Sequence, residues 1–143
     1  FFKFRTNDLK VDFRELRELA LENLQTANLA YEHKLYNTAL ENFHFALEKI
    51  MKSAIYKEGG NPPISGQKGH DLVAIANTKV AGRKYLHKAI MSDRAMVKYW
   101  TEVRGFWSTQ QRYKAVAIDL LEMDDIVSAY EGLVRWIDKN LID

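Results

Sequence analysis

The chain has 143 residues, a formal net charge of +2, 47% hydrophobic residues and no cysteine. This composition is that of one ordinary globular domain, which needs no disulfide or metal ion to hold its core. The lack of cysteine excludes thiol nucleophiles, redox dithiols, iron–sulfur clusters and cysteine-ligated zinc, and it favours a reducing, cytoplasmic location. No apolar run has the length of a membrane helix, and no phosphate-loop, dinucleotide-fold, zincin or serine-hydrolase motif is present.

The N-terminal part of the chain predicts two long helices that form a hairpin. Apolar residues at helical spacing predict a first helix over residues 8–33, with Asn7 or Asp8 as its cap, and a second helix over about 37–58. The connection between them is very short, so the two helices are expected to pack antiparallel.

The second helix carries more apolar side chains than one stripe accounts for. Phe45 and Ile55 lie off the main stripe and indicate a second packed face, against a further helix or a partner subunit. After this helix, residues 59–69 hold four of the seven glycines and both prolines and must form a loop. The loop has the glycine content of a phosphate-binding loop without its spacing, so both a structural connector and a ligand loop stay open.

The second half of the chain predicts further helices separated by breaks. No strand-like alternation persists, so the chain is predicted to be an all-α, up-and-down bundle of about five helices with a four-helix core. The predicted segments are a short helix opening at His70-Asp71-Leu72, one or two turns over 83–91 after a break at Gly82, a helix over about 93–107 capped by Ser92-Asp93, and a last helix over about 122–141.

Four short motifs follow one another along the middle of the chain. They are Tyr36-Asn37-x-Ala39-Leu40, Ala46-Leu47-Glu48-Lys49-Ile50-Met51-Lys52, Gly59-Gly60-Asn61-Pro62-Pro63 and His70-Asp71-Leu72. In order and spacing they resemble the HEPN family (higher eukaryotes and prokaryotes nucleotide-binding) over residues 10–76, and the resemblance continues over 90–140 by helix order alone. It implies a four-to-five-helix bundle, usually a homodimer. Such a domain either cleaves RNA without a metal or acts without catalysis, binding a nucleotide or pairing with a minimal nucleotidyltransferase.

The RNA-cleaving members of that family carry an arginine followed, after four to six residues, by a histidine. The resemblance implies a histidine as general acid and base and an arginine on the scissile phosphate. Here Arg104 lies near the matching helix end, but residues 109–111 hold no histidine, and Arg83 precedes His87 by one position too few. The sequence therefore favours a non-catalytic member. A metal-independent RNase with a degenerate motif and a pure protein-interaction module are the alternatives.

The net charge of +2 averages over three unlike segments. Residues 1–78 sum to 0, residues 79–114 to +7 and residues 115–143 to −5. Basic residues interleaved with aromatic ones suit a ligand with phosphates and bases, because cations contact the phosphates and rings stack on the bases. Two alternatives stay open: the rings belong to the core, and the basic segment pairs with the acidic last helix within the bundle or across a dimer. The interleaved rings are Tyr85, Tyr99, Trp100, Phe106, Trp107 and Tyr113.

A phosphate-binding site is predicted on the basic segment, and no catalytic, metal-binding or cofactor-binding residue is predicted. For His44 and Glu48, one helical turn apart, packing is favoured over a metal pair. The expected partners are a second copy of the chain, a nucleotidyltransferase, and a nucleotide or RNA. The chain is expected to form one domain over 1–143, either within or beside a nucleotidyltransferase. The residues expected to contact phosphate are Arg83, Lys84, His87, which can also donate a proton, Arg104 and Arg112.

Overall fold

The computed structural model describes residues 11–63, 67–110 and 119–143, and every regular element in these ranges is helical. The predicted all-α fold is confirmed. Four long helices make up the bundle, namely α2 (Phe13–Glu32), α3 (Tyr36–Lys57), α6 (Arg94–Gln110) and α7 (Leu120–Ile137). The shorter elements are the 3₁₀ turn η1 (Gln67–His70), α4 (Leu72–Ala76), α5 (Tyr85–Met91) and a π-helical turn, η3 (Asp138–Ile142), that continues α7.

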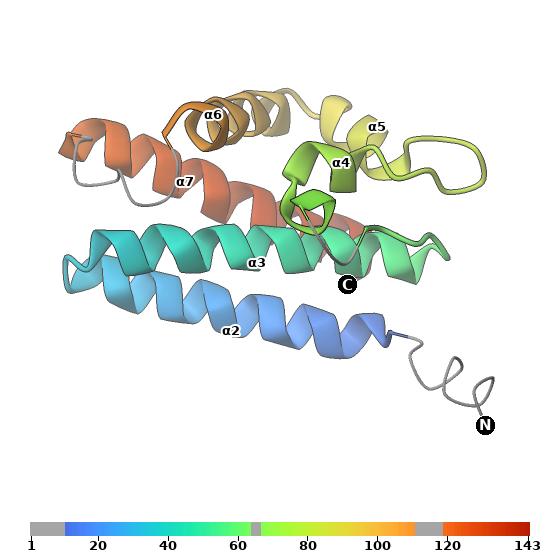
Figure 1. The fold of residues 1–143 in the computed structure, drawn as a ribbon, viewed down its shortest axis with the longest axis horizontal. Helices are drawn as coiled ribbons and strands as arrows, with labels where there is room; N and C mark the ends of the chain where they lie inside the picture. The colour runs from blue at the N-terminus through green and yellow to red at the C-terminus, as the bar shows by residue number, and fades with distance from the viewer. Residues whose placement is uncertain (1–10, 64–66, 111–118) are drawn as a thin grey trace.

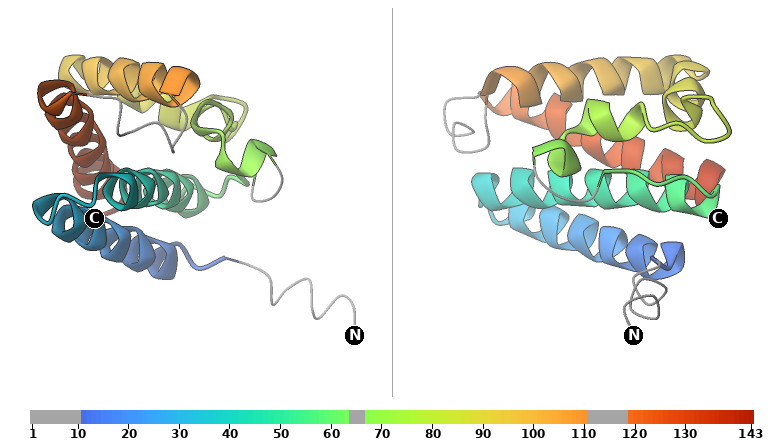
Figure 2. Two further views of the ribbon diagram at one scale, coloured as in Figure 1. Left: turned by 60° about the vertical axis from the view of Figure 1, so that its left-hand side comes forward. Right: turned by 45° about the vertical axis from the view of Figure 1, so that its right-hand side comes forward.

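The helix α3 lies at the centre of the molecule. It packs against α2, α7, α4 and α5, whereas α6 packs against α7 and α5 (Figure 1). Figure 2 shows that α6 lies on the far side of α3 from α2. The outward faces of α2 and α6 are therefore on opposite sides of the bundle.

The hairpin of α2 and α3 begins later than predicted. The cap of α2 is Asp12, whose carboxylate accepts from the amide of Arg14 at 2.9 Å. The predicted caps Asn7 and Asp8 lie outside the described residues. Asp12 satisfies one of the orphan amides of the first turn, and so the helix starts at Phe13. The predicted antiparallel pairing is confirmed, with Lys34 in the left-handed region at φ 62° to reverse the chain.

The second packed face of α3 is taken by other helices of the same chain. Ile55 is fully buried, and Ser53 donates to the carbonyl of Phe13 at 2.7 Å. Phe45, the other residue off the main stripe, is half-buried, with the ammonium of Lys49 5.9 Å from its ring centre. A central helix must be buried almost all round, which is why one stripe could not account for its apolar residues.

The later helices start close to where their capping residues predict. Asp71 accepts from the amides of Val73 and Ala74 and opens α4, and Asp93 accepts from the amides of Ala95 and Met96 in the first turn of α6. The helix α6 continues to Gln110, three residues beyond its predicted end. Asp119 caps α7 by accepting from the amide of Glu122 at 2.9 Å. Asp93 and Asp119 thus stabilise the first turns of α6, in the basic segment, and of α7, in the acidic segment.

One glycine fixes how closely α6 and α7 approach. Gly132 of α7 faces the ring of Tyr99 of α6, and a Cβ placed at Gly132 would lie 2.4 Å from Cε2 of that ring. Only a residue without a side chain leaves room for the Tyr99 ring at this point. The far end of α7 is tied to α2 by the ion pair of Asp138 with Arg17.

Candidate functional site

The turn before α5 holds Arg83 away from any helix. Val80 and Arg83 exchange two backbone hydrogen bonds, of 2.7 and 3.0 Å. Ala81 and Gly82, between them, adopt φ values of 52° and 79°. This tight turn ends before α5 begins at Tyr85, so Arg83 lies outside the helix, and the prediction of helical turns from residue 83 is wrong at its start. Two successive residues with positive φ cannot belong to a right-handed helix, and they leave Arg83 exposed on the turn.

The helix α5 presents its cations to solvent. Leu86 and Ile90 are buried against the core, and Lys84 and Lys88 are exposed. Lys84 precedes the helix and makes no side-chain cap. His87 is half-buried, so it is the least accessible of the predicted site residues that the structure describes.

The cations of α6 follow the side opposite its core. Met96, Trp100, Val103 and Phe106 are buried. At 100° per residue, Arg94 and Lys98 point almost directly away from that stripe, and both are exposed. Arg104 is also exposed and lies to one side of them, with its guanidinium 6.0 Å from the ring centre of Trp100. Arg112 lies outside the described residues.

The predicted site residues do not converge on one pocket. Three of them, Arg83, Lys84 and His87, lie where α5 begins. The start of α5 is near the start of α6 (Figure 1), whereas Arg104 lies on the later half of α6. From Arg94 to Arg104 the helix advances about 15 Å. The structure instead shows a row of exposed cations along the α4–α5 turn, α5 and α6. We call this row the basic surface: Lys79, Arg83, Lys84, Lys88, Arg94, Lys98 and Arg104.

The acidic last helix does not neutralise the basic surface. Among the described residues, none of the seven cations forms an ion pair with a carboxylate. Three of the seven acids in residues 115–143 form ion pairs elsewhere, since Glu131 pairs with Arg135 on α7 itself, and Asp138 and Asp143 pair with Arg17 of α2. The helices α6 and α7 do pack together, but within the described ranges no ion pair joins them. The alternative that the basic segment pairs with the acidic last helix within the bundle is therefore not supported by the described residues.

The aromatic rings of the basic segment are used for packing. Trp100 and Phe106 are buried, and Tyr99 lies against Gly132. The ring of Trp107 stacks on His44 of α3 with 3.5 Å between ring centres and 14° between planes. Tyr85 packs against the core, where burial, and next the charge of Glu58, raise the pKa of its phenol. The alternative that these rings belong to the core is confirmed for all of them except Tyr113, which lies outside the described residues.

A buried carboxylate joins two of the sequence motifs. Glu48 is 6% exposed, and its carboxylate lies 3.3 Å from Nζ of Lys52 and 3.1 Å from Nδ1 of His70. The ring of His70 is mostly exposed, so the pair lies where the motif of α3 meets the start of α4. Asp71, next in the chain, is the cap of α4. His70 is thus not a cap, and it anchors the connector to α3 through Glu48.

A second buried polar contact continues from this group. Nδ1 of His44 lies 3.1 Å from the hydroxyl of Tyr130 on α7, and Nε2 lies 4.0 Å from the carboxylate of Glu48. Tyr130 is fully buried, and burial raises the pKa of its phenol strongly. The expectation that His44 serves packing is confirmed by its burial and its ring contacts. Within the described ranges, no three acidic or histidine side chains are arranged to hold a metal ion.

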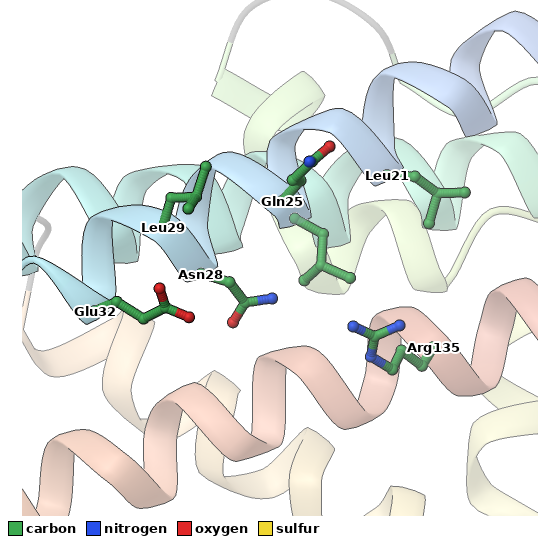
Figure 3. A pocket seen from close by; sticks show the side chains of 7 residues that line it. Leu21, Gln25, Asn28, Leu29, Glu32 and Arg135 are labelled. Carbon is green, nitrogen blue, oxygen red and sulfur yellow. The ribbon is translucent and has the colours of Figure 1, made fainter.

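A pocket of about 450 Å³ lies between α2 and α7, and none of the predicted site residues lines it. Figure 3 shows the side chains of α2 on one wall and Arg135 of α7 on the other. Arg135 is already bonded to Glu131 at 2.8 Å. The lining residues are Leu21, Leu24, Gln25, Asn28, Leu29, Glu32 and Arg135.

None of the helices in the described part of the chain combines the length and apolar character that a bilayer-spanning segment needs.

The model of the HEPN domain family matches the chain over residues 13–140. Comparison with curated proteins and with solved structures finds no match.

Proposed function

Because the chain belongs to the HEPN domain family, we propose that it is a non-catalytic domain that binds a phosphate-bearing ligand, a nucleotide or a nucleic acid, through the basic surface. The observation that carries this proposal is that the seven cations are exposed and that, among the described residues, no carboxylate pairs with them. An incoming phosphate then gains the attraction of several cations without first breaking ion pairs within the domain.

The spacing of the candidate acid and base supports binding in preference to RNA cleavage. Cleavage through a 2′-hydroxyl needs a proton donor or acceptor and a phosphate-binding cation at one scissile bond. Arg83 stands on a turn before the helix that carries His87, and His87 itself is half-buried. Arg104 is on another helix, in its later half. This placement does not favour a shared catalytic site within one copy of the chain.

The wider organisation of the protein belongs to the same proposal. We propose that residues 1–143 form one domain and that this domain forms a homodimer. It is either part of a nucleotidyltransferase chain or the partner of a separate one, since HEPN domains commonly pair with such enzymes. An acidic face of such a partner would meet the same cations as a phosphate does. A test of the proposal must therefore use ligands that contain phosphate and no protein.

The test is fluorescence polarisation with labelled ATP, GTP and a short RNA, repeated at increasing salt. The triple variant Arg83→Glu, Lys84→Glu, Arg104→Glu should lose at least about tenfold in affinity, taking about 0.5–1 kcal/mol for each exposed charge contact. The matched control reverses Arg14, Lys34 and Lys139, three exposed cations outside the basic surface, and should bind like the wild type. Absence of salt-sensitive binding to all three ligands, or equal losses in both triple variants, would refute the proposal.

A further inference from the structure

The basic surface is longer than a free nucleotide. Arg94, Lys98 and Arg104 alone cover about 15 Å of α6, and the seven residues of α5 add at most about 10 Å. The charges of a nucleoside triphosphate lie within a few bonds of one another. A nucleic acid strand, by contrast, places one phosphate about every 3.4 Å along a helix axis. Four or five successive phosphates would therefore span the α6 part of the surface.

The rings that could have held a base are already in use. Trp100 and Phe106 are buried, Tyr99 covers Gly132, and Trp107 stacks on His44. Base stacking on an aromatic side chain needs an exposed ring face. Among the described residues, the basic segment thus offers no ring that is fully exposed.

Three cations of the surface stand on outward helix faces. Arg94 and Lys98 point away from the buried stripe of α6, and Lys88 points away from the buried residues of α5. The pocket between α2 and α7 is lined by none of these cations (Figure 3).

From the length, the occupied rings and the outward faces, we propose that the ligand is an extended nucleic acid, contacted through its phosphodiester backbone alone and without reading of its bases, and that a free nucleotide is not the ligand. This inference rests on the proposed function and narrows it. Backbone contact carries no sequence information, so binding should be insensitive to base and sugar and strongly dependent on salt.

The experiment is a competition series against a labelled hexadecanucleotide. The competitors are ATP, homopolymer oligonucleotides of two to sixteen residues in DNA and RNA, a duplex, and inorganic polyphosphate of matched charge. Affinity should rise with length up to about eight nucleotides, at about 3.4 Å for each. It should differ less than threefold between bases, and polyphosphate should compete as well as an oligonucleotide of equal charge. ATP at equal phosphate concentration should compete at least a hundredfold more weakly.

The variant Arg94→Gln, Lys98→Gln removes two contacts in the middle of the surface. It should make the slope of log affinity against log salt shallower by about 1.4 for a single strand, taking about 0.7 for each phosphate contact. The control Arg14→Gln, Lys34→Gln should leave the slope unchanged. The inference is wrong if ATP competes as well as an octanucleotide, or if one base is preferred tenfold, although the proposed function would survive either result. If neither oligonucleotide nor polyphosphate binds, the proposed function fails as well.

Discussion

At the scale of single residues, the buried group around Glu48 distinguishes this domain from a plain apolar bundle. Its carboxylate is shielded from solvent and faces the ammonium of Lys52 and the ring of His70. A buried charge is tolerated only when its partners are in place. The contact also ties the connector, whose start is at Gly59, to the middle of α3. Glu48 therefore holds together two segments that lie 22 residues apart in the sequence.

The variant Glu48→Ala should destabilise the domain by about 3–5 kcal/mol, because Lys52 would remain buried without its carboxylate. Urea unfolding followed by circular dichroism measures the free energy of unfolding. Glu41, exposed on the same helix, is the control, and Glu41→Ala should stay within about 0.5 kcal/mol of the wild type. Replacing both partners, as Glu48→Leu with Lys52→Met, should recover most of the loss. If the double variant is no more stable than Glu48→Ala, an unpaired lysine is not the cause of the loss.

The buried phenol of Tyr130 predicts a particular dependence of stability on pH. Burial raises its pKa in the folded protein above the unfolded value of about 10. Between these two values the unfolded chain loses a proton that the folded one keeps, so the free energy of unfolding falls as pH rises above about 10. Tyr130→Phe should remove up to about 1.4 kcal/mol of that fall for each pH unit. Urea unfolding at several pH values compares the two proteins, and parallel pH curves would contradict the assignment.

At the scale of elements, the contact of α6 with α7 decides how the basic helix is held. Tyr99 lies over Gly132, and this close approach keeps the core side of α6 turned inward. Arg94 and Lys98 consequently face outward, and Arg104 is exposed to one side of them. The orientation of the basic surface thus depends on a residue of the acidic helix, through packing and without an ion pair between them among the described residues.

Alanine variants of two helical glycines separate the effect of side-chain packing on stability from the effect of helix propensity. Gly132→Ala should destabilise the domain by about 1–3 kcal/mol, because its Cβ would overlap the Tyr99 ring. Gly105→Ala, within α6, should stabilise it by about 0.5–1 kcal/mol, since a Cβ there meets no atom within 4 Å and alanine favours the helix. Thermal unfolding of the two variants gives the comparison. If the two variants change the stability equally and in the same direction, the contact of Gly132 with Tyr99 does not determine how closely α6 and α7 pack.

The helices themselves follow from the sequence, whereas the contacts between distant segments do not. Period and capping residues predicted α3 within a residue at each end and the start of α6, because these signals are local. The pairing of His70 with Glu48 could not be predicted, since it depends on how the connector returns to α3. Arg83 was placed on a helix because the sequence marks the break at Gly82 but does not show that Arg83 closes the turn through two backbone hydrogen bonds with Val80.

At the scale of the whole molecule, the basic and acidic segments lie side by side without ion pairs between their described residues. The +7 and −5 segments pack against each other through apolar contacts, and the described cations of the first remain exposed on the side of the bundle away from α2. The order of charged residues in the sequence indicated this partition of charge, but it could not show whether the acidic helix pairs with the basic residues. The answer depends on the side of α7 that faces α6, where Gly132 and apolar residues lie.

The most direct test of the central claim is the salt dependence of binding of an octanucleotide to the wild-type domain, between about 50 and 200 mM salt. The account predicts that log affinity falls linearly with log salt, with a slope of about −5 if each of the seven cations of the basic surface contributes about 0.7. It also predicts that the triple variant at Arg83, Lys84 and Arg104 shows a much shallower slope. A wild-type affinity that does not change with salt, or a slope that the triple variant leaves intact, would contradict the claim that the basic surface binds phosphate.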